Sequence, residues 1–472
     1  MRDGARLCVH RFSNTSQSSR PPPIGLRGTN PRRGCGQIRG TQRDESAVDT
    51  RTDRQYDPSM EHYPRHAAAG VLEAMGDTPV VAINGPRQSG KSTLASGLEL
   101  PGRRVERVSL DDAQVRASAR LDPRGFVERP VDTLVIDEVQ LEPGLFRAIK
   151  AAVDRDRRPG RFLITGSARL LSAPDMADAL VGRVETIALW PLSQGEICGS
   201  VDQFVDAAFD RPEELLRPGT LTRQDYVDAA IRGGFPEAVS RSPKRRGPWF
   251  ESYATTIVQR VVSAISDIDR LNEIPRLVRL CAARSAAELN VASLSREMGI
   301  PAKTLDGYLA LLANAFVLRL VPAWSTNLSA KVVRAPKLHL VDPGLAAHLV
   351  GVTGLSTHVP TAPIGALLET FAVTEIDRQL VWSKNQPTLW HFRDRGGPEV
   401  DIVLEHPDGR VVGIEVKASS TIGPKDFRGL TFLRERLGTR FHRGIVLSTA
   451  PEALPFGDRL VALPLSALWD AA

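Results

Sequence analysis

Hydrophobic and polar segments alternate regularly between residues 80 and 195, and this pattern predicts a layered α/β domain. Short, mainly apolar runs separate polar turns from a helical segment expected at 145–154. The expected strands are residues 80–84, 104–109, 134–136 and 161–168. Because strands that alternate with helices pair in parallel, we predict a parallel sheet with helices on both faces.

Residues 285–324 show the pattern of two short helices followed by a strand. Ser293 is expected to cap the first helix, a Gly-Ile-Pro turn follows, and the second helix covers 303–314. This order is typical of a winged helix-turn-helix. Two roles remain open, DNA binding and packing between larger domains, because the second helix offers Lys303 but also Asp306.

Further along the chain, residues 337–345 are expected to form a strand that leads into a helix. Asp342 is the expected cap of that helix, and Pro343 occupies its first position. An amphipathic helix is expected at 365–380.

The strands expected at 399–405 and 411–418 form a hairpin whose register follows from its apolar positions. With the turn centred on Asp408, every inward position of one strand faces an apolar position of the other. The expected pairs are Val400 with Val416, Ile402 with Ile414, and Leu404 with Val412. Moving the turn by half a residue would place Glu415 opposite Ile402, so the pattern selects the first register.

Composition indicates several folded domains behind a different first segment. The chain has 472 residues, of which 42% are hydrophobic, and a formal net charge of +6, which permits nucleic-acid partners without establishing one. The first segment is rich in Arg, Ser, Pro and Gly, so we expect it to be disordered and favour Met60 as the true start. Scattered cysteines fit a reducing, cytoplasmic location, and the lack of a long apolar run predicts no membrane span. The expected parts are 1–59 (disordered), 60–195 (nucleotide-binding domain), 196–350 (helical region with the winged helix at about 285–324) and 360–472 (C-terminal domain).

The strongest chemical signal is the stretch GPRQSGKST, which directly follows the first expected strand. It contains the phosphate-binding pattern G-x-x-x-x-G-K-S, in which glycines let backbone N–H groups converge on phosphate oxygens. Lys91 is expected to reach the β- and γ-phosphates, and the Ser92 hydroxyl to bind Mg²⁺. The residues expected to bind the nucleotide are Gly85, Pro86, Arg87, Gln88, Ser89, Gly90, Lys91, Ser92 and Thr93.

An acidic pair follows the apolar strand 134–136. Asp137 is expected to hold the Mg²⁺, partly through water, and Glu138 to polarise the attacking water. Alone, the pair would fit equally well as a cap of the following helix. Behind a complete phosphate-binding pattern, we favour the catalytic role.

Two more residues are candidates for this site. Ser167 ends a strand where a polar group can sense the γ-phosphate, with Thr165 as the second choice and a plain turn serine as the alternative. Arg183 is a candidate arginine finger, which in trans would require a homo-oligomer. An ordinary surface arginine is the competing interpretation.

The selected hairpin register places Asp401 directly opposite Glu415, and these like charges should repel. A Mg²⁺ ion would offset the repulsion, because both side chains offer hard oxygen ligands. Lys417 lies on the same face and would then orient a water or stabilise charge on a phosphate. The alternative is a solvated ion pair in which Lys417 alone neutralises the two acids.

Several stretches together resemble a widespread prokaryotic ATPase family: GPRQSGKST, LVIDEVQ, FLITGSARLL, LVGRVETIALWPLS and GGFPEAV. Its members join an AAA-type P-loop ATPase module to a C-terminal domain of unknown function with a nuclease-like fold. The resemblance covers about residue 61 to the C-terminus and implies ATP binding and hydrolysis. The Asp401, Glu415 and Lys417 arrangement also resembles the core of restriction-endonuclease-like nucleases, and Glu369 matches the extra acid common in that fold.

The expected fold is therefore α/β, with a P-loop AAA-type ATPase domain, a winged-helix middle region and an α/β nuclease-like C-terminal domain. ATP and Mg²⁺ are the expected cofactors. Two functions remain open. One is an ATP-driven enzyme that processes or binds DNA, and the other is an ATP-dependent switch or scaffold whose C-terminal domain is an inactive partner-binding module.

Overall fold

Contacts divide the chain into two units, residues 1–60 and 61–472, and the description below concerns the second. The computed structural model describes residues 63–167, 179–263, 273–325, 334–353, 363–394 and 396–470. The Arg-rich segment at 1–59, for which we expected disorder, lies outside the described residues. Among the described helices, none is both long and apolar enough to cross a membrane.

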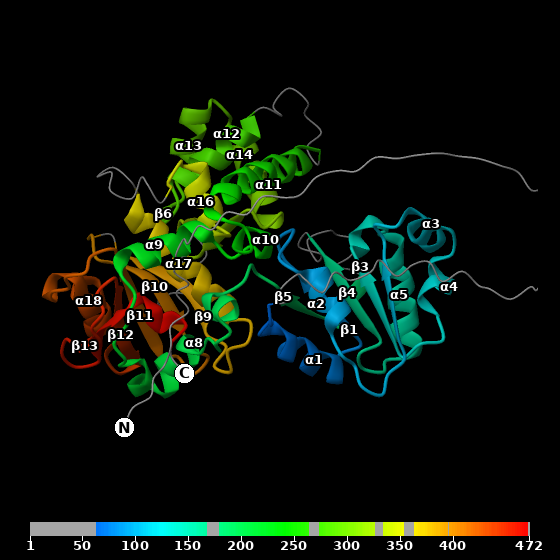
Figure 1. Cartoon of the computed structure of the whole chain (residues 1–472), viewed down its shortest axis with the longest axis horizontal. Coiled ribbons are helices and arrows are strands. Elements are labelled where there is room, and N and C mark those ends of the chain that lie inside the picture. Colours follow the sequence, from blue (N-terminus) through cyan, green and yellow to red (C-terminus); the bar gives the residue numbers. More distant parts are fainter. Residues whose placement is uncertain are drawn as a thin grey trace, which may run out of the picture. The chain divides into compact units, whose positions relative to one another are not determined.

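The first module is built on a five-stranded parallel sheet in the order β2-β3-β4-β1-β5 (Figure 1). The predicted parallel sheet is confirmed. Its strands are β1 (Val80–Asn84), β2 (Val105–Ser109), β3 (Thr133–Asp137), β4 (Phe162–Gly166) and β5 (Val184–Ala188). Its helices are α1 (Ala67–Asp77), α2 (Lys91–Gly97), α3 (Ala113–Leu121), α4 (Pro123–Val127) and α5 (Gly144–Arg155).

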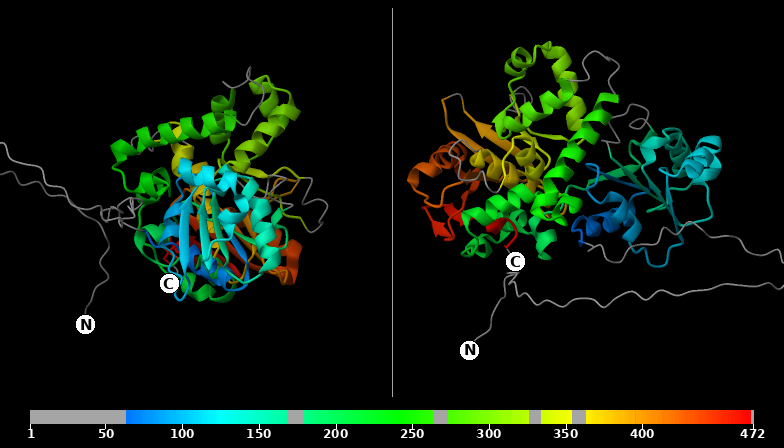
Figure 2. Two further views of the ribbon diagram at one scale, coloured as in Figure 1. Left: turned by 90° about the vertical axis from the view of Figure 1, so that its right-hand side faces the viewer. Right: turned by 45° about the horizontal axis from the view of Figure 1, so that its top comes forward.

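Helices cover both faces of this sheet because the buried side chains of each central strand point alternately to two cores (Figure 2). Val80 and Ala82 of β1 pack with apolar residues of α3, α4 and α5. Val81 and Ile83 pack with residues of α1 and α2 on the opposite face. Burial on both faces explains why these strands are continuously apolar.

The strand order brings the chemical motifs to one edge of the sheet. β4 lies between β3 and β1, and the last residues of β1 and β4, Asn84 and Gly166, are paired. Strand β3 runs parallel to β2, and the two strands end level with each other, because their last residues, Asp137 and Ser109, are paired. In parallel sheets ligands bind at this carboxyl edge, so the fold itself collects the phosphate-binding loop, the acidic pair and the end of β4.

The middle of the chain is mainly helical and carries an antiparallel three-stranded sheet in the order β6-β8-β7. Its helices are α7 (Gln194–Cys198), α8 (Phe204–Asp210), α9 (Arg223–Arg232), α10 (Pro236–Val239), α11 (Pro243–Ser263), α12 (Glu273–Ala283), α13 (Val291–Met298), α14 (Ala302–Asn314) and α16 (Pro343–Leu349). Its strands are β6 (Ala287–Glu288), β7 (Leu318–Val321) and β8 (Lys337–Leu340).

Two helix caps were predicted in this region, and one prediction was wrong. The first winged-helix segment begins earlier than expected, because the Asn290 side chain accepts a hydrogen bond from the Ser293 backbone N–H at 2.9 Å. Asn290, and not Ser293, is therefore the cap. The other prediction is confirmed, since Asp342 caps α16 by accepting from the Leu345 N–H at 3.0 Å.

The C-terminal module contains a six-stranded mixed sheet in the order β13-β14-β12-β11-β10-β9. Its elements are α17 (Ile364–Gln379), β9 (Thr388–Arg393), β10 (Glu399–Glu405), β11 (Val411–Lys417), α18 (Arg428–Leu437), β12 (Phe441–Ser448), β13 (Leu454–Pro455) and β14 (Leu460–Pro464). Ile402 pairs with Ile414 and Leu404 with Val412, so the predicted hairpin register is confirmed.

The sequence predicted an amphipathic helix in this region, and that prediction is wrong. Helix α17 is buried around most of its circumference. It contacts β11, α8, α9 and α16, and so lies between the sheet and a helical layer. Residues of α8 and α9 share one hydrophobic core with this sheet, so packing does not separate the predicted region 196–350 from the C-terminal domain. Charged residues of α17 form ion pairs, Arg378 with Glu375 of the same helix and Asp377 with Arg319 of β7.

Candidate nucleotide site and a second acidic centre

A cavity of about 520 Å³ opens at the carboxyl edge of the parallel sheet. Its volume lies in the range of small-molecule sites. One wall is the phosphate-binding loop, and Asp111 and Glu138 line it from the neighbouring strand ends. The opposite wall is helix α11. The lining residues are Arg87, Gln88, Gly90, Lys91, Ser92, Thr93, Asp111, Glu138, Trp249, Ser252, Tyr253, Thr256 and Ile257.

The phosphate-binding loop has the backbone that its glycines permit. Gly90 has φ 93° and Gly85 has φ 151°, both conformations that other residues rarely adopt. A Cβ atom at Gly85 would lie 2.2 Å from the Leu189 carbonyl oxygen, so no side chain fits there. Lys91 is buried, and its ammonium donates to the carbonyl oxygens of Gly85 at 3.2 Å and Pro86 at 2.7 Å.

Burial lowers the pKa of Lys91 to about 8, because the ammonium loses water and Arg87 adds a second positive charge nearby. Glu138 and Asp137 act in the opposite direction and only partly compensate. In the free protein, Lys91 is therefore charged below about pH 8 and increasingly neutral above it.

Nucleotide affinity is accordingly expected to be constant from about pH 6 to 7.5 and to fall above about pH 8, approaching tenfold per pH unit. Equilibrium titration with ATP and Mg²⁺ across this range measures the effect. Lys91→Arg, which keeps its charge, should remove the pH dependence wherever it still binds. Affinity that stays constant to pH 9.5 in the wild type would contradict a titrating Lys91.

The oxygen atoms of Ser92, Asp137 and Thr165 meet at the position expected for Mg²⁺. The Ser92 hydroxyl donates to Asp137 Oδ1 at 2.8 Å, and the Thr165 hydroxyl donates to the same oxygen at 2.5 Å. A carboxylate beside a hydroxyl next to the phosphate-binding loop is a fitting donor set for Mg²⁺, which also takes phosphate oxygens and water. Thr165, the reserve choice for a γ-phosphate sensor, thus contacts the candidate metal ligand directly.

Glu138 lines the cavity and is held in an unusual backbone conformation. Its φ of 53° lies in the left-handed region, which is sparsely populated for a residue with a side chain. The Glu138 N–H donates to the Thr165 hydroxyl at 3.2 Å. Ser167, the first-choice sensor, donates to Glu138 Oε2 at 3.3 Å and is not part of the cavity wall. Ser167 therefore contacts the candidate water-activating group.

Arg183 lies at the opposite edge of the sheet from the cavity. It directly precedes β5, whose first residue pairs with Val80, the first residue of β1. The phosphate-binding loop follows the other end of β1, about 16 Å away at about 3.3 Å per residue. The Arg183 guanidinium pairs with Asp154 at 2.6 Å. The structure thus excludes Arg183 from the site of its own chain, and a role in trans stays a prediction.

The α11 wall was missed by the sequence analysis. Its five lining residues are Trp249, Ser252, Tyr253, Thr256 and Ile257. This spacing of three and four residues places them on one helix face. The sequence shows the periodic W-x-x-S-Y-x-x-T-I pattern. The pattern does not indicate that this helix face lines the nucleotide cavity.

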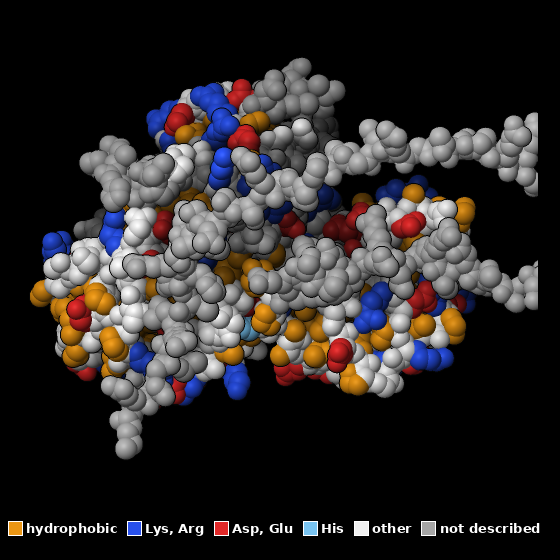
Figure 3. Space-filling model, viewed as in Figure 1, with side chains coloured by type: hydrophobic (Ala, Val, Ile, Leu, Met, Phe, Trp, Pro, Cys, Tyr) orange, Lys and Arg blue, Asp and Glu red, His pale blue; other side chains and the backbone are white. Residues whose placement is uncertain are grey.

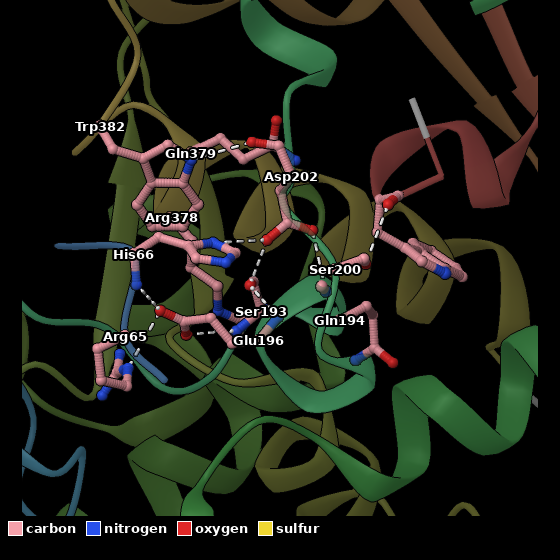
Figure 4. A network of polar contacts seen from close by, with 12 residues as sticks. Arg65, His66, Ser193, Gln194, Glu196, Ser200, Asp202, Arg378, Gln379 and Trp382 are labelled. Carbon is pink, nitrogen blue, oxygen red and sulfur yellow. Dashed lines mark hydrogen bonds and ion pairs between the residues drawn. The ribbon is translucent and has the colours of Figure 1, made fainter. Parts of the chain in front are cut away.

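Figure 4 shows a network of polar contacts that includes Arg65, His66 and the acidic residues Glu196 and Asp202. The Arg65 guanidinium donates to the Ser89 carbonyl oxygen at 2.6 Å, to the Trp190 carbonyl oxygen at 2.7 Å and to Glu196 Oε1 at 3.1 Å. His66, beside it, lies 3.2 Å from a carboxylate oxygen of Asp202. The network therefore joins the phosphate-binding loop to the segment that follows β5.

Burial by itself would lower the pKa of His66, but contact with Asp202 and the negative charge of Glu196 outweigh it and raise the pKa. The Ser193 hydroxyl also donates to Asp202, at 2.5 Å. Since the serine and the histidine both bind the carboxylate and not each other, this is a structural brace and not a nucleophilic triad.

A second acidic centre lies in the C-terminal module, and a residue that the sequence analysis did not name occupies it. Lys337 of β8 is buried, and its ammonium donates to Glu369 Oε1 at 2.8 Å and to Asp401 Oδ1 at 2.9 Å. Lys417 donates to Glu415 Oε2 at 2.9 Å. The carboxylates thus lie close together as predicted, but each has a lysine as its partner.

The pKa values of the carboxyl groups in this centre depend on burial and on the charges around them. Burial would raise the pKa of Asp401, but Lys337, the Val416 N–H and Lys417 together outweigh burial and lower the pKa. Burial, together with the negative charge of Asp401, raises the pKa of both Glu369 and Glu415. Among the described residues, no group of three or more His, Cys, Asp or Glu side chains is arranged to hold a metal ion. The predicted second Mg²⁺ site is therefore closed by Lys337 in this structure.

One match to a known protein family spans the first site. Residues 77–198 match an AAA domain, and this range contains the phosphate-binding loop, Asp137, Glu138 and Ser167. The chain carries an AAA-type ATPase domain. Residues 223–356 match a domain of unknown function (DUF8612), and residues 364–468 match another (DUF4143). The AAA-domain match also covers Arg183, at the far edge of the sheet.

The chain is also similar to two uncharacterized mycobacterial proteins and to two solved structures. The chain is 28% identical over 406 residues to the uncharacterized proteins Mb2031c of Mycobacterium bovis and Rv2008c of Mycobacterium tuberculosis, covering 85% of this chain and 83% of each relative. Among solved structures, the Walker-type ATPase PABY2304 of Pyrococcus abyssi is 14% identical with a TM-score of 0.36, covering 61% of this chain and 96% of that one. A DNA replication initiation factor is 16% identical with a TM-score of 0.23, covering 53% and 91%.

Proposed function

We propose that the protein is a Mg²⁺-dependent ATPase whose AAA-type domain hydrolyses ATP in the cavity between the phosphate-binding loop and α11. The observation that carries the proposal is the convergence of Lys91, Asp137 and Glu138 at one edge of a parallel sheet, in the roles that phosphoryl transfer requires. Gly85–Thr93 would bind the phosphates, and Ser92 and Asp137 would hold the metal ion. The ion held there would supply positive charge that neutralises part of the charge of the phosphates.

Hydrolysis then follows from the chain's own groups. Glu138 orients a water molecule and accepts its proton as the water oxygen forms a bond to the γ-phosphorus. The bond from that phosphorus to the bridging oxygen breaks, its electron pair stays on the departing ADP, and phosphate is the second product. Lys91 stabilises the charge on the β- and γ-phosphate oxygens.

Glu138→Gln tests the proposal, because it keeps the size of the side chain and removes its ability to accept a proton. Phosphate release in the presence of Mg²⁺ is expected to fall by at least about 100-fold, while ATP still binds. Glu185→Gln, an exposed residue of β5, is the matched control and should hydrolyse ATP like the wild type. Unchanged hydrolysis in Glu138→Gln would contradict the assignment of the general base.

For the C-terminal module, Lys337 favours the second of the two functions left open by the sequence. A nuclease-like centre needs its acids free for a divalent cation, but here an ammonium bridges Glu369 and Asp401. We therefore favour an ATP-dependent switch or scaffold in which this module binds a partner. Mg²⁺-dependent cleavage of DNA or RNA that is lost in Glu415→Ala would instead favour a nuclease.

The charge of the surface over α12–α14 supports nucleic acid as the partner. Lys and Arg side chains gather over α12–α14, among some acidic ones (Figure 3). Arg276, Arg279, Arg296 and Lys303 are exposed there. The elements α12, β6, α13, α14, β7 and β8 follow one another in the order of a winged helix. Binding through this face should weaken steeply with salt, because phosphate contacts release counterions.

A further inference from the structure

The nucleotide cavity is lined by a half-buried cation whose role is not explained by the fold. Arg87, in the middle of the phosphate-binding loop, lines the cavity. Its Nε atom is buried and, among the described residues, has no hydrogen-bond partner. No described carboxylate forms an ion pair with it either. Because an unpaired buried guanidinium N–H costs free energy, this atom points to an anionic ligand in the cavity.

Helix α11 contacts the backbone of Arg87. The Tyr253 hydroxyl donates to the Arg87 carbonyl oxygen at 3.3 Å. Tyr253 is only 7% exposed and stacks against Trp249, with ring centroids 5.2 Å apart and planes 18° from parallel. Phe235 packs against the same ring at 4.6 Å. The tyrosine is thus a rigid support for this part of the loop.

Arg87 lies in the electrostatic environment of the groups that would act on the γ-phosphate. Its charge contributes to lowering the pKa of Lys91, so the two cations are close enough to interact. Glu138 lines the same cavity. Arg183, the arginine that the sequence suggested as a finger, is at the far edge of the sheet and paired with Asp154.

We propose that Arg87 is the catalytic arginine of this ATPase, supplied in cis by the phosphate-binding loop, and that Tyr253 is its positioning residue. The proposal rests on the ATPase function proposed above and adds the residue that neutralises the transition state. As water attacks the γ-phosphorus and the bond to the bridging oxygen breaks, charge shifts toward the oxygens of that phosphoryl group and of ADP. The Arg87 guanidinium stabilises this charge, and ground-state binding relies mainly on the loop N–H groups and Lys91.

Arg87→Gln tests the proposal by two readouts. ATP turnover is expected to fall about 1,000-fold, the lower end of the effect of arginine fingers. Affinity for ADP should change by less than about threefold, whereas the tighter binding of ADP with aluminium fluoride, a transition-state mimic, should be lost. Arg428→Gln, an exposed arginine of α18, is the matched control and should match the wild type in both measurements.

Tyr253→Phe tests the positioning role, because it removes the hydroxyl and keeps the ring. The expected result is a roughly fivefold lower kcat with an unchanged KM for ATP, as for one lost neutral hydrogen bond. A tyrosine with only a structural role would instead lower the melting temperature and leave kcat unchanged well below it.

Three results would overturn the proposal: full turnover in Arg87→Gln, equal loss of ADP and transition-state-mimic affinity, or loss of turnover in Arg183→Gln with Arg87→Gln unaffected. These outcomes differ from failure of the ATPase function itself. If the wild type releases no phosphate from ATP with Mg²⁺, the proposed function fails. If the wild type hydrolyses ATP and Arg87→Gln does too, only the role of Arg87 fails.

Discussion

Lys91→Ala is expected to reduce ATP hydrolysis by about 100- to 1,000-fold and to weaken ATP binding as well. Lys91 is the buried cation nearest the loop carbonyls, and its contacts with Gly85 and Pro86 hold it ready beside the phosphate position. Removing it takes away a charge that acts on both the ground state and the transition state. Phosphate release and equilibrium nucleotide binding, measured on the same preparation, separate the two contributions.

The stability of Lys91→Ala should not fall, which makes the activity result easy to interpret. Lys91 is buried and its ammonium has carbonyl partners only, so burial disfavours its charge and lowers its pKa to about 8. Lys425→Ala, at an exposed lysine, serves as the control. Hydrolysis at the wild-type rate in Lys91→Ala would remove the main support for this nucleotide site.

The second large effect is expected at Lys337. Replacing it with Met leaves Glu369 and Asp401 buried without their shared counter-charge, and the free energy of unfolding should fall by about 3–5 kcal/mol. The Lys337 side chain is only 5% exposed, so solvent screens this loss poorly. Urea unfolding measures the change. Lys417→Met should cost less, because the Lys417 side chain is 34% exposed.

Two additions to that experiment identify the cause. Combining Lys337→Met with Glu369→Gln and Asp401→Asn removes the unpaired charges and should restore much of the stability. If the two acids serve only to form ion pairs, millimolar Mg²⁺ should not change the free energy of unfolding of Lys337→Met. Stabilisation of that variant by Mg²⁺ would show that these carboxylates take a metal once the lysine is gone, and would favour the nuclease interpretation.

Much of the architecture was predictable because the signals are local. The run 80–84 is apolar at successive positions, the glycine-rich stretch directly follows it, and β1 begins and ends at the predicted residues. The 399–417 hairpin could be registered from sequence because a one-residue shift would bring charged residues opposite apolar ones. Asp342 capping was also predictable, since a cap needs only its own side chain and the next N–H groups.

The errors arose where neighbours in space override local pattern. Helix α17 has polar residues at intervals that suggest an exposed face, yet α8, α9 and α16 cover it. Its polar groups are tolerated because they have partners, as Arg378 does in Glu375 of the same helix and Asp377 does in Arg319 of β7. The Ser293 error is different, because it is local: Ser293 has the chemistry of a cap, but Asn290, three residues earlier, forms the bond.

The sequence by itself determined that this protein has a phosphate-binding loop, an acidic pair behind an apolar strand, and two carboxylates that face each other on a hairpin. Each of these depends on spacing within a short stretch or on strand pairing, both of which the chain encodes locally. Only the tertiary structure decided that α11 forms the other wall of the cavity, that Arg87 and not Arg183 faces it, and that Lys337 lies between Glu369 and Asp401. The physical reason is that the function of a charged group or an aromatic ring depends on the groups that surround it, and these are distant in sequence. Burial strengthens the interactions between such groups, because it removes the water that would screen them.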